Sequence, residues 1–330
     1  MPGPASLSDD LRSFSDAVSS FLDQLANLQW QPLLIGLAVF VAYLSTRARA
    51  YFHVLRAAYP DEPFQYRRIW GAYMAAYGFN NVVPARGGDI IKLFLTKTSV
   101  PNATYPAIGA AMVVESVFDV VMGVFILTFA FTQGVFPKPP DWASLNAFDL
   151  SFFADNPRLL LFTLTVLAVL GLVLFAWLNQ RVARFWARVR QGLTILFDRP
   201  RYLREVFAVQ FCAWLLRFTA FWFLLDAFHI GGSVKNVLLV LGVNAVAAAV
   251  PFTPGGAGVV QAFLVKVFAG TASAATVAAY SVGQQVAIAT VTFLVGFLAL
   301  ATIFRFRSFR HVIEAGRAHR EEERRAQEPA

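Results

Sequence analysis

Long apolar runs alternate with short polar segments along most of the chain. Five runs approach or exceed the ~20 residues that a helix needs to cross a ~30 Å hydrocarbon layer. They cover residues 30–46, 105–132, 157–178, 206–228 and 276–304. The pattern predicts transmembrane helices in these runs and argues against a soluble enzyme fold.

Glycine and proline interrupt two further apolar segments, residues 69–83 and 234–268. Proline lacks a backbone N–H and glycine frees the backbone, so helices break at these residues. A broken helix at membrane depth is tolerated only where it is buried in protein or lines a cavity. The two segments therefore predict re-entrant hairpins beside a polar cavity.

The broken segments share one order of residues and suggest an internal repeat. Val83-Pro84 precedes Gly87-Gly88, and Val250-Pro251 precedes Gly255-Gly256. The run 157–178 reverses the chain direction between them, so the two halves have inverted topology. Paired broken helices in inverted halves are typical of transporters. We expect an all-α polytopic membrane protein with an inverted repeat and two re-entrant hairpins, the alternative being kinks within seven ordinary spans.

The pattern also divides the chain into three parts. Residues 1–29 include an amphipathic stretch with leucines at steps of three or four, which predicts a helix lying at the outer interface. Residues 30–304 form the transmembrane domain, and residues 305–330 form a charged cytoplasmic tail. Within the transmembrane domain we expect a first half at about 30–132, a linking span at 157–178 and a second half at about 206–304.

Composition and charge predict how the chain is oriented in the membrane. Hydrophobic residues make up 57% of the chain and charged residues 15%, and the net charge is +8. The arginines gather beside the spans, at 47–68, 181–204 and 305–325, and the positive-inside rule places such segments in the cytoplasm. This predicts a multi-pass protein of the inner cell membrane with its N-terminus outside and its C-terminus inside.

Three charged residues lie deep within predicted spans, about ten residues or more from either end. A charge such as Arg217 costs about 2.5–3.5 kcal/mol at a helix centre, so it should avoid lipid, and it either binds a phosphate or forms a structural ion pair. Glu115 and Asp119 are four residues apart and share one helix face. They either pair with Arg217 or Arg86, or act as a proton relay.

The broken segments offer a phosphate site. Arg86 stands before Gly87 and Gly88 at the start of a half-helix, where a guanidinium and free backbone N–H groups suit an anion. The alternative is an interfacial arginine that reaches toward lipid headgroups. In the second half a hydroxyl and unshielded backbone could hold the same headgroup, although helix breaking alone also explains these residues. They are Thr253, Gly255, Gly256 and Gly258.

No motif for metal or cofactor chemistry stands out. The four histidines lack metal-ligand spacing and the one cysteine lies in a predicted span. No phosphate-binding loop or dinucleotide fingerprint occurs. The sequence therefore predicts no cofactor, no metal and no nucleic-acid partner.

Three stretches carry a resemblance to a known family. They are Asn80 to Asp89 with Lys92, Glu115 with Asp119, and Val250 to Gly258. They resemble the transmembrane region of bacterial lysylphosphatidylglycerol synthases, a flippase-like family. The resemblance implies movement of a phospholipid or polyprenyl-type lipid between leaflets, and it implies substrate-binding roles for Asp89 and Lys92.

The chain also departs from this family. Ser116, Gln261 and Gln284 or Gln285 stand where the family often has charged residues. The soluble domain that makes aminoacyl lipid in fused relatives is absent from this chain, so we do not expect an enzyme.

The function expected from the sequence is therefore flipping or scrambling of an anionic lipid through a polar cavity. Membrane lipids would be the partners, and a homo-oligomer or a lipid-modifying partner enzyme is compatible with this interpretation. Two alternatives stay open. One is a membrane enzyme with Glu115 and Asp119 as acid and base, and the other is a non-transporting scaffold of an envelope lipid complex.

Overall fold

The computed structural model describes residues 27–81, 87–133, 185–247 and 259–305, and all regular elements in these ranges are helices. In chain order they are α2 (Trp30–Ala58), α3 (Tyr66–Asn80), α4 (Gly87–Ser99), α5 (Tyr105–Thr132), η3 (Thr194–Phe197), α8 (Arg199–Tyr202), η4 (Leu203–Phe207), α9 (Ala208–Ala227), α10 (Val234–Ala247), α11 (Val259–Val267) and α12 (Ala274–Ile303). Residues 185–192 are also helical.

Four helical stretches in the described ranges are long and apolar enough to cross a membrane. They are Trp30–Ala58, Tyr105–Phe129, Arg199–Ala227 and Ala274–Ile303. The third joins α8, η4 and α9 into one stretch. This confirms the prediction of an all-α polytopic membrane protein. The predicted span 157–178 and the predicted amphipathic helix of residues 1–29, apart from residues 27–29, lie outside the described residues.

The first span is longer than its apolar run predicts. We expected it to end at residue 46 and a basic loop to follow, whereas α2 continues to Ala58. The arginines of its extra turns contact aromatic rings of the protein. Arg49 lies 5.5 Å from the centre of the Phe52 ring and Arg56 lies 5.0 Å from that of Phe64. The arginines of this segment are therefore helical, and the boundary predicted at residue 46 is wrong.

Two helix pairs hold the bundle together. α2 packs along α9, and α12 packs along α3. Glycines bring the second pair close. A Cβ added to Gly78 would lie 2.6 Å from the carbonyl oxygen of Thr292, and one added to Gly296 would lie 2.7 Å from that of Met74. Such close backbone approach through small residues is how helices associate within membranes.

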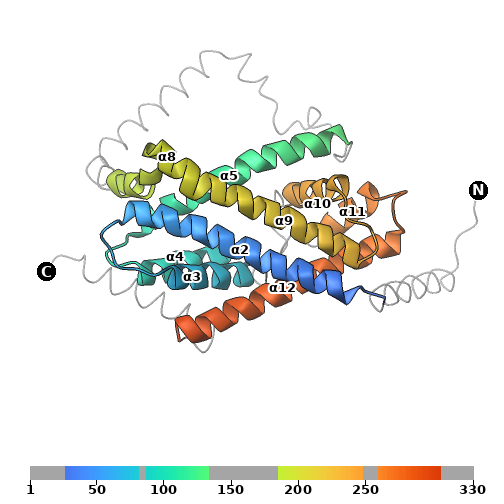
Figure 1. The fold of residues 1–330 in the computed structure, drawn as a ribbon, viewed down its shortest axis with the longest axis horizontal. Coiled ribbons are helices and arrows are strands. Elements are labelled where there is room, and N and C mark those ends of the chain that lie inside the picture. Colours follow the sequence, from blue (N-terminus) through green and yellow to red (C-terminus); the bar gives the residue numbers. More distant parts are fainter. Residues whose placement is uncertain (1–26, 82–86, 134–184, 248–258, 306–330) are drawn as a thin grey trace, which may run out of the picture.

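The shorter helices occupy opposite ends of the bundle. α3 and α4 lie toward one end and α10 and α11 toward the other, each pair beside longer helices (Figure 1). They have 15, 13, 14 and 9 residues, fewer than the ~20 that a full crossing needs. The joining segments 82–86 and 248–258 lie outside the described residues. The inverted repeat and the re-entrant course of these pairs therefore stay predictions.

The close approach of α3 and α12 makes Gly296→Ala destabilising. Its new methyl group would meet backbone atoms of Met74 and Ala75, which do not yield as a side chain does. We expect a loss of about 1–3 kcal/mol, the usual cost of overpacking. Thermal unfolding of the purified protein in detergent measures it.

Gly123→Ala is the matched control, because a Cβ at Gly123 meets no atom within 4 Å. This change should leave stability unaltered or raise it slightly, since alanine favours helix over glycine. Equal effects at the two glycines would contradict close packing of α3 on α12.

Candidate functional site

A buried arginine joins both carboxylates of α5. Arg47 of α2 is 9% exposed, and its Nη2 donates to Glu115 Oε1 at 2.9 Å and to Asp119 Oδ2 at 2.6 Å. Its Nε donates to Glu115 Oε1 at 3.2 Å and its Nη1 to Asp119 Oδ1 at 2.9 Å. Glu115 and Asp119 thus share one face of α5, as their spacing predicts. The guanidinium of Arg47 donates hydrogen bonds to both.

Glu115 is the most heavily bonded member of this cluster. The Lys92 ammonium of α4 lies 2.5 Å from its Oε2, and the Tyr73 hydroxyl of α3 donates to its Oε1 at 2.5 Å. Lys92 also lies over the rings of Tyr51 and Tyr73, 4.0 and 4.2 Å from their centres. Glu115 is 4% exposed and Lys92 7%. Four helices therefore meet at one carboxylate, and no solvent reaches it.

Asp119 occupies the open side of the cluster. Its side chain is 33% exposed, and its Oδ1 also accepts from Trp214 Nε1 of α9 at 3.1 Å. Gln210, one turn earlier on α9, donates to the Glu115 carbonyl oxygen at 3.1 Å. The cluster thereby ties α9 to α5.

The counter-charge of these carboxylates differs from the sequence expectation. We expected Arg217 or Arg86 as the partner, whereas the ion pairs of the described residues use Arg47 and Lys92. Arg47 was assigned to a loop because it follows the apolar run. The helical spacing of Tyr51, Val54 and Leu55 beyond it is the signal that would have kept it within the span.

Arg217 projects from the middle of α9 beside the cluster, and no described carboxylate pairs with it. Its guanidinium carbon lies 4.8 Å from the ring centre of Trp214, 5.8 Å from that of Tyr43 and 6.0 Å from that of Phe221. Within the described ranges no carboxylate lies within salt-bridge distance of it. The described ion pairs of the cluster thus join Arg47 and Lys92 to Glu115 and Asp119 and do not include Arg217.

The start of α4 is fixed to the end of α3. Gly88 N donates to Asn80 Oδ1 at 2.7 Å, and Asn80 Nδ2 donates to Asp89 Oδ1 at 3.2 Å. A Cβ on Gly88 would lie 2.0 Å from the Ala76 carbonyl oxygen, so the close approach demands glycine. Gly88 and Asp89 therefore join α4 to α3, and α4 begins at Gly87.

Five predicted site residues cannot be placed in this geometry. They lie outside the described residues and are Arg86, Thr253, Gly255, Gly256 and Gly258.

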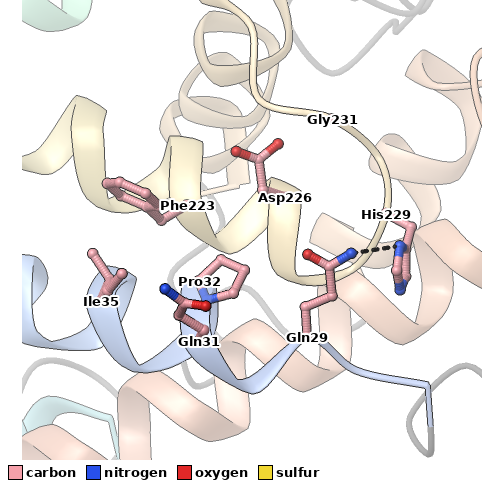
Figure 2. Close-up of a pocket in the computed structure, with 8 residues that line it drawn as sticks. All are labelled: Gln29, Gln31, Pro32, Ile35, Phe223, Asp226, His229 and Gly231. Carbon is pink, nitrogen blue, oxygen red and sulfur yellow. Dashed lines mark hydrogen bonds between the residues drawn. The ribbon is translucent and has the colours of Figure 1, made fainter.

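A pocket of about 540 Å³ with a mixed polar and apolar lining opens between the start of α2 and the end of α9 (Figure 2). Its polar lining includes Gln29, Gln31, Asp226 and His229. Gln29 Nε2 lies 3.2 Å from His229 Nδ1, and Asp226 Oδ1 accepts from Gly232 N at 2.5 Å. No local sequence pattern reveals this pocket, because its two walls are about 200 residues apart in the chain.

A second pocket, of about 480 Å³, opens at the other end of α2. It lies between the α2–α3 loop and the α4–α5 loop, and its charged lining residues are Arg68 and Lys97. The two pockets therefore differ in charge, since the described lining of the first includes a carboxylate and no lysine or arginine.

Comparison with known families agrees with a membrane-spanning fold. The model of the lysylphosphatidylglycerol synthase TM region matches residues 13–296. The chain belongs to this family. The match spans Arg47, Glu115, Asp119 and Arg217, and it confirms the resemblance drawn from the sequence. Searches of curated proteins and of solved structures found no match.

Membership of the lysylphosphatidylglycerol synthase TM-region family places the chain among membrane proteins of lipid metabolism or transport. The apolar helices agree with a multi-pass member. Among the described residues there is no group of three or more histidine, cysteine or acidic side chains that could bind a metal ion.

The cluster predicts that neutralising its two carboxylates lowers the stability of the protein by unequal amounts. Glu115→Gln leaves Lys92 and one side of Arg47 buried without a counter-charge, which costs about 3–5 kcal/mol. Asp119→Asn should cost less, because its side chain is partly exposed and Arg47 keeps Glu115. Thermal unfolding of each variant in detergent compares them, and equal tolerance of both changes would contradict the cluster.

Proposed function

We propose that this protein moves a phosphate-bearing anionic lipid between leaflets, with the headgroup passing through the polar interior and the acyl chains staying in the bilayer. One observation carries the proposal. Arg217, at the middle of a membrane-spanning helix, has aromatic rings around it and no described carboxylate partner. An ionisable residue at such depth commonly marks a substrate pathway.

The surroundings of Arg217 suit a phosphate. A guanidinium presents its N–H donors in one plane, and two of them bind a phosphate in bidentate fashion. Contact with aromatic rings uses the face of this group and leaves its donating edge available. Trp214 and Tyr43 therefore support the charge without consuming its hydrogen bonds.

The neighbouring ion cluster favours one class of substrate. Glu115 and Asp119 are already bound to Arg47 and Lys92, and the described ion pairs leave Arg217 without a carboxylate. A single phosphodiester would supply the missing negative charge. Arg86, Thr253 and the glycines of the second broken segment remain candidates for further contacts with the same group.

The contacts of Glu115 weaken the alternative of a membrane enzyme. A general base must reach the proton that it removes. Glu115 is sealed from solvent and already accepts from Arg47, Lys92 and Tyr73. Asp119 alone has the exposure that a substrate would need. Transport requires neither carboxylate to react, and we therefore favour it.

Proteoliposomes test the proposal. The purified chain should move fluorescent phosphatidylglycerol from the outer to the inner leaflet faster than fluorescent phosphatidylcholine, as dithionite quenching measures. Arg217→Ala should lower the rate of phosphatidylglycerol movement at least about tenfold, because a hydrogen bond to a charged group contributes about 1.5–3 kcal/mol.

Arg204→Ala is the matched control, since Arg204 belongs to the same helical stretch and its side chain is 81% exposed. It should leave the rate unchanged. A folded Arg217→Ala protein with the full rate, or a wild type that moves no anionic lipid, would contradict the proposal.

The orientation is part of the proposal. We place the α2–α3 loop in the cytoplasm and the α11–α12 loop outside, because arginines gather at the first of these ends. The two loops lie at opposite ends of the bundle (Figure 1).

Cysteine labelling in intact cells tests this orientation. A membrane-impermeant maleimide should modify Thr271→Cys and not Asp61→Cys, both of which replace exposed loop residues. The native Cys212, which faces outward from α9, is the background control. Labelling of Asp61→Cys but not of Thr271→Cys would reverse the orientation.

A further inference from the structure

The second pocket has no part in the site just described. It has a volume of about 480 Å³, within the usual range for a ligand pocket, and lies between the first turn of α3 and the end of α4. Arg68 lines it from α3 and Lys97 from α4. No carboxylate belongs to its described lining.

Arg68 has no evident role in holding the fold. It lies in the first turn of α3 beside Arg67, and that turn contains no acidic residue and no side-chain cap. Positive charge at a helix N-terminus opposes the helix dipole, so both arginines are unfavourable there. Among the described residues, Arg68 forms no ion pair.

The loops around the pocket are fixed by other contacts. Asn102 Nδ2 donates to Glu62 Oε1 at 2.9 Å, which joins the α4–α5 loop to the α2–α3 loop. The Glu62 carbonyl oxygen accepts from Arg56 at 2.7 Å. The Glu62 carboxylate is therefore held by the neighbouring loop, and it is not part of the described pocket lining.

We propose that this pocket binds a phosphate group through Arg68 and Lys97. Arg68 provides a planar pair of donors, and Lys97 provides a point charge from the facing helix. The same chemistry fits the headgroup of an anionic lipid or a free phosphate. The opposite pocket at Asp226 has the reverse polarity, so a basic pocket is not a general property of the bundle ends.

Binding at this pocket does not depend on transport. Its use as the loading point for lipid, by contrast, rests on the proposed function. The pocket lies at the end of the bundle that we place in the cytoplasm, so it would receive a headgroup before Arg217 does.

The reactivity of Lys97 reports on this site alone. The full chain in neutral detergent is treated with an amine-acylating reagent, and modification at each lysine is followed by peptide mass spectrometry. Dihexanoyl phosphatidylglycerol should slow modification of Lys97 about fivefold or more, and dihexanoyl phosphatidylcholine should not. Lys235, exposed at the opposite end, should react equally with both lipids.

Inorganic phosphate at the same concentration distinguishes the two sources. Protection by the lipid alone indicates a headgroup site that also uses the glycerol or acyl part, whereas equal protection by phosphate indicates a site for soluble phosphate. Both results support the pocket. No protection of Lys97 by either anionic probe overturns it.

Two adjacent arginines give a matched pair of variants. Arg68→Ala should abolish protection of Lys97, and Arg67→Ala, which removes an equal charge outside the pocket lining, should preserve it. Equal loss in both variants would show general surface attraction and overturn the proposal. Arg217→Ala should keep the protection even where transport is lost, so failure of the pocket and failure of the transport proposal are distinguishable.

Discussion

The ion cluster centred on Arg47 is the interaction on which the helix arrangement depends. Burying a charge in an apolar bundle is expensive unless the charge is paired and hydrogen-bonded. Arg47 and Lys92 meet this requirement only when α2, α4 and α5 bring them to Glu115. Tyr73 adds α3 to the same carboxylate, and Trp214 adds α9 through Asp119. The pairing thus specifies the register of five helices at once.

The cluster also explains why Arg217 is available. Asp119 is a carboxylate that the sequence offered as a partner for Arg217, and both of its oxygens accept from Arg47. Arg217 is left with aromatic neighbours, which support a cation without neutralising it. An anion that enters the interior therefore meets one uncommitted guanidinium beside a charge-balanced cluster. This division between structural and substrate-binding cations is the basis of the transport proposal.

Sequence reasoning found the features that depend on local pattern. Apolar runs located the described spans, and a four-residue spacing placed Glu115 and Asp119 on one face. Partners distant in the chain were harder to find. Arg47 was assigned to a loop beyond the first span, because no local rule reveals a carboxylate 68 residues away. A substrate-binding role was expected for Lys92, and either an ion pair or a functional role for Glu115, and the structure pairs these two residues in the interior. Both pockets join separate segments and leave no continuous motif.

Double-mutant cycles on the free energy of unfolding test the division of charges most directly. The coupling between Arg47→Met and Asp119→Asn should reach about 1.5 kcal/mol or more, as for residues in one buried network. The coupling between Arg217→Met and Asp119→Asn should stay below about 0.5 kcal/mol. If Arg217 instead couples to Asp119 as strongly as Arg47 does, Arg217 is a structural counter-ion and the account of its role in binding lipid is contradicted.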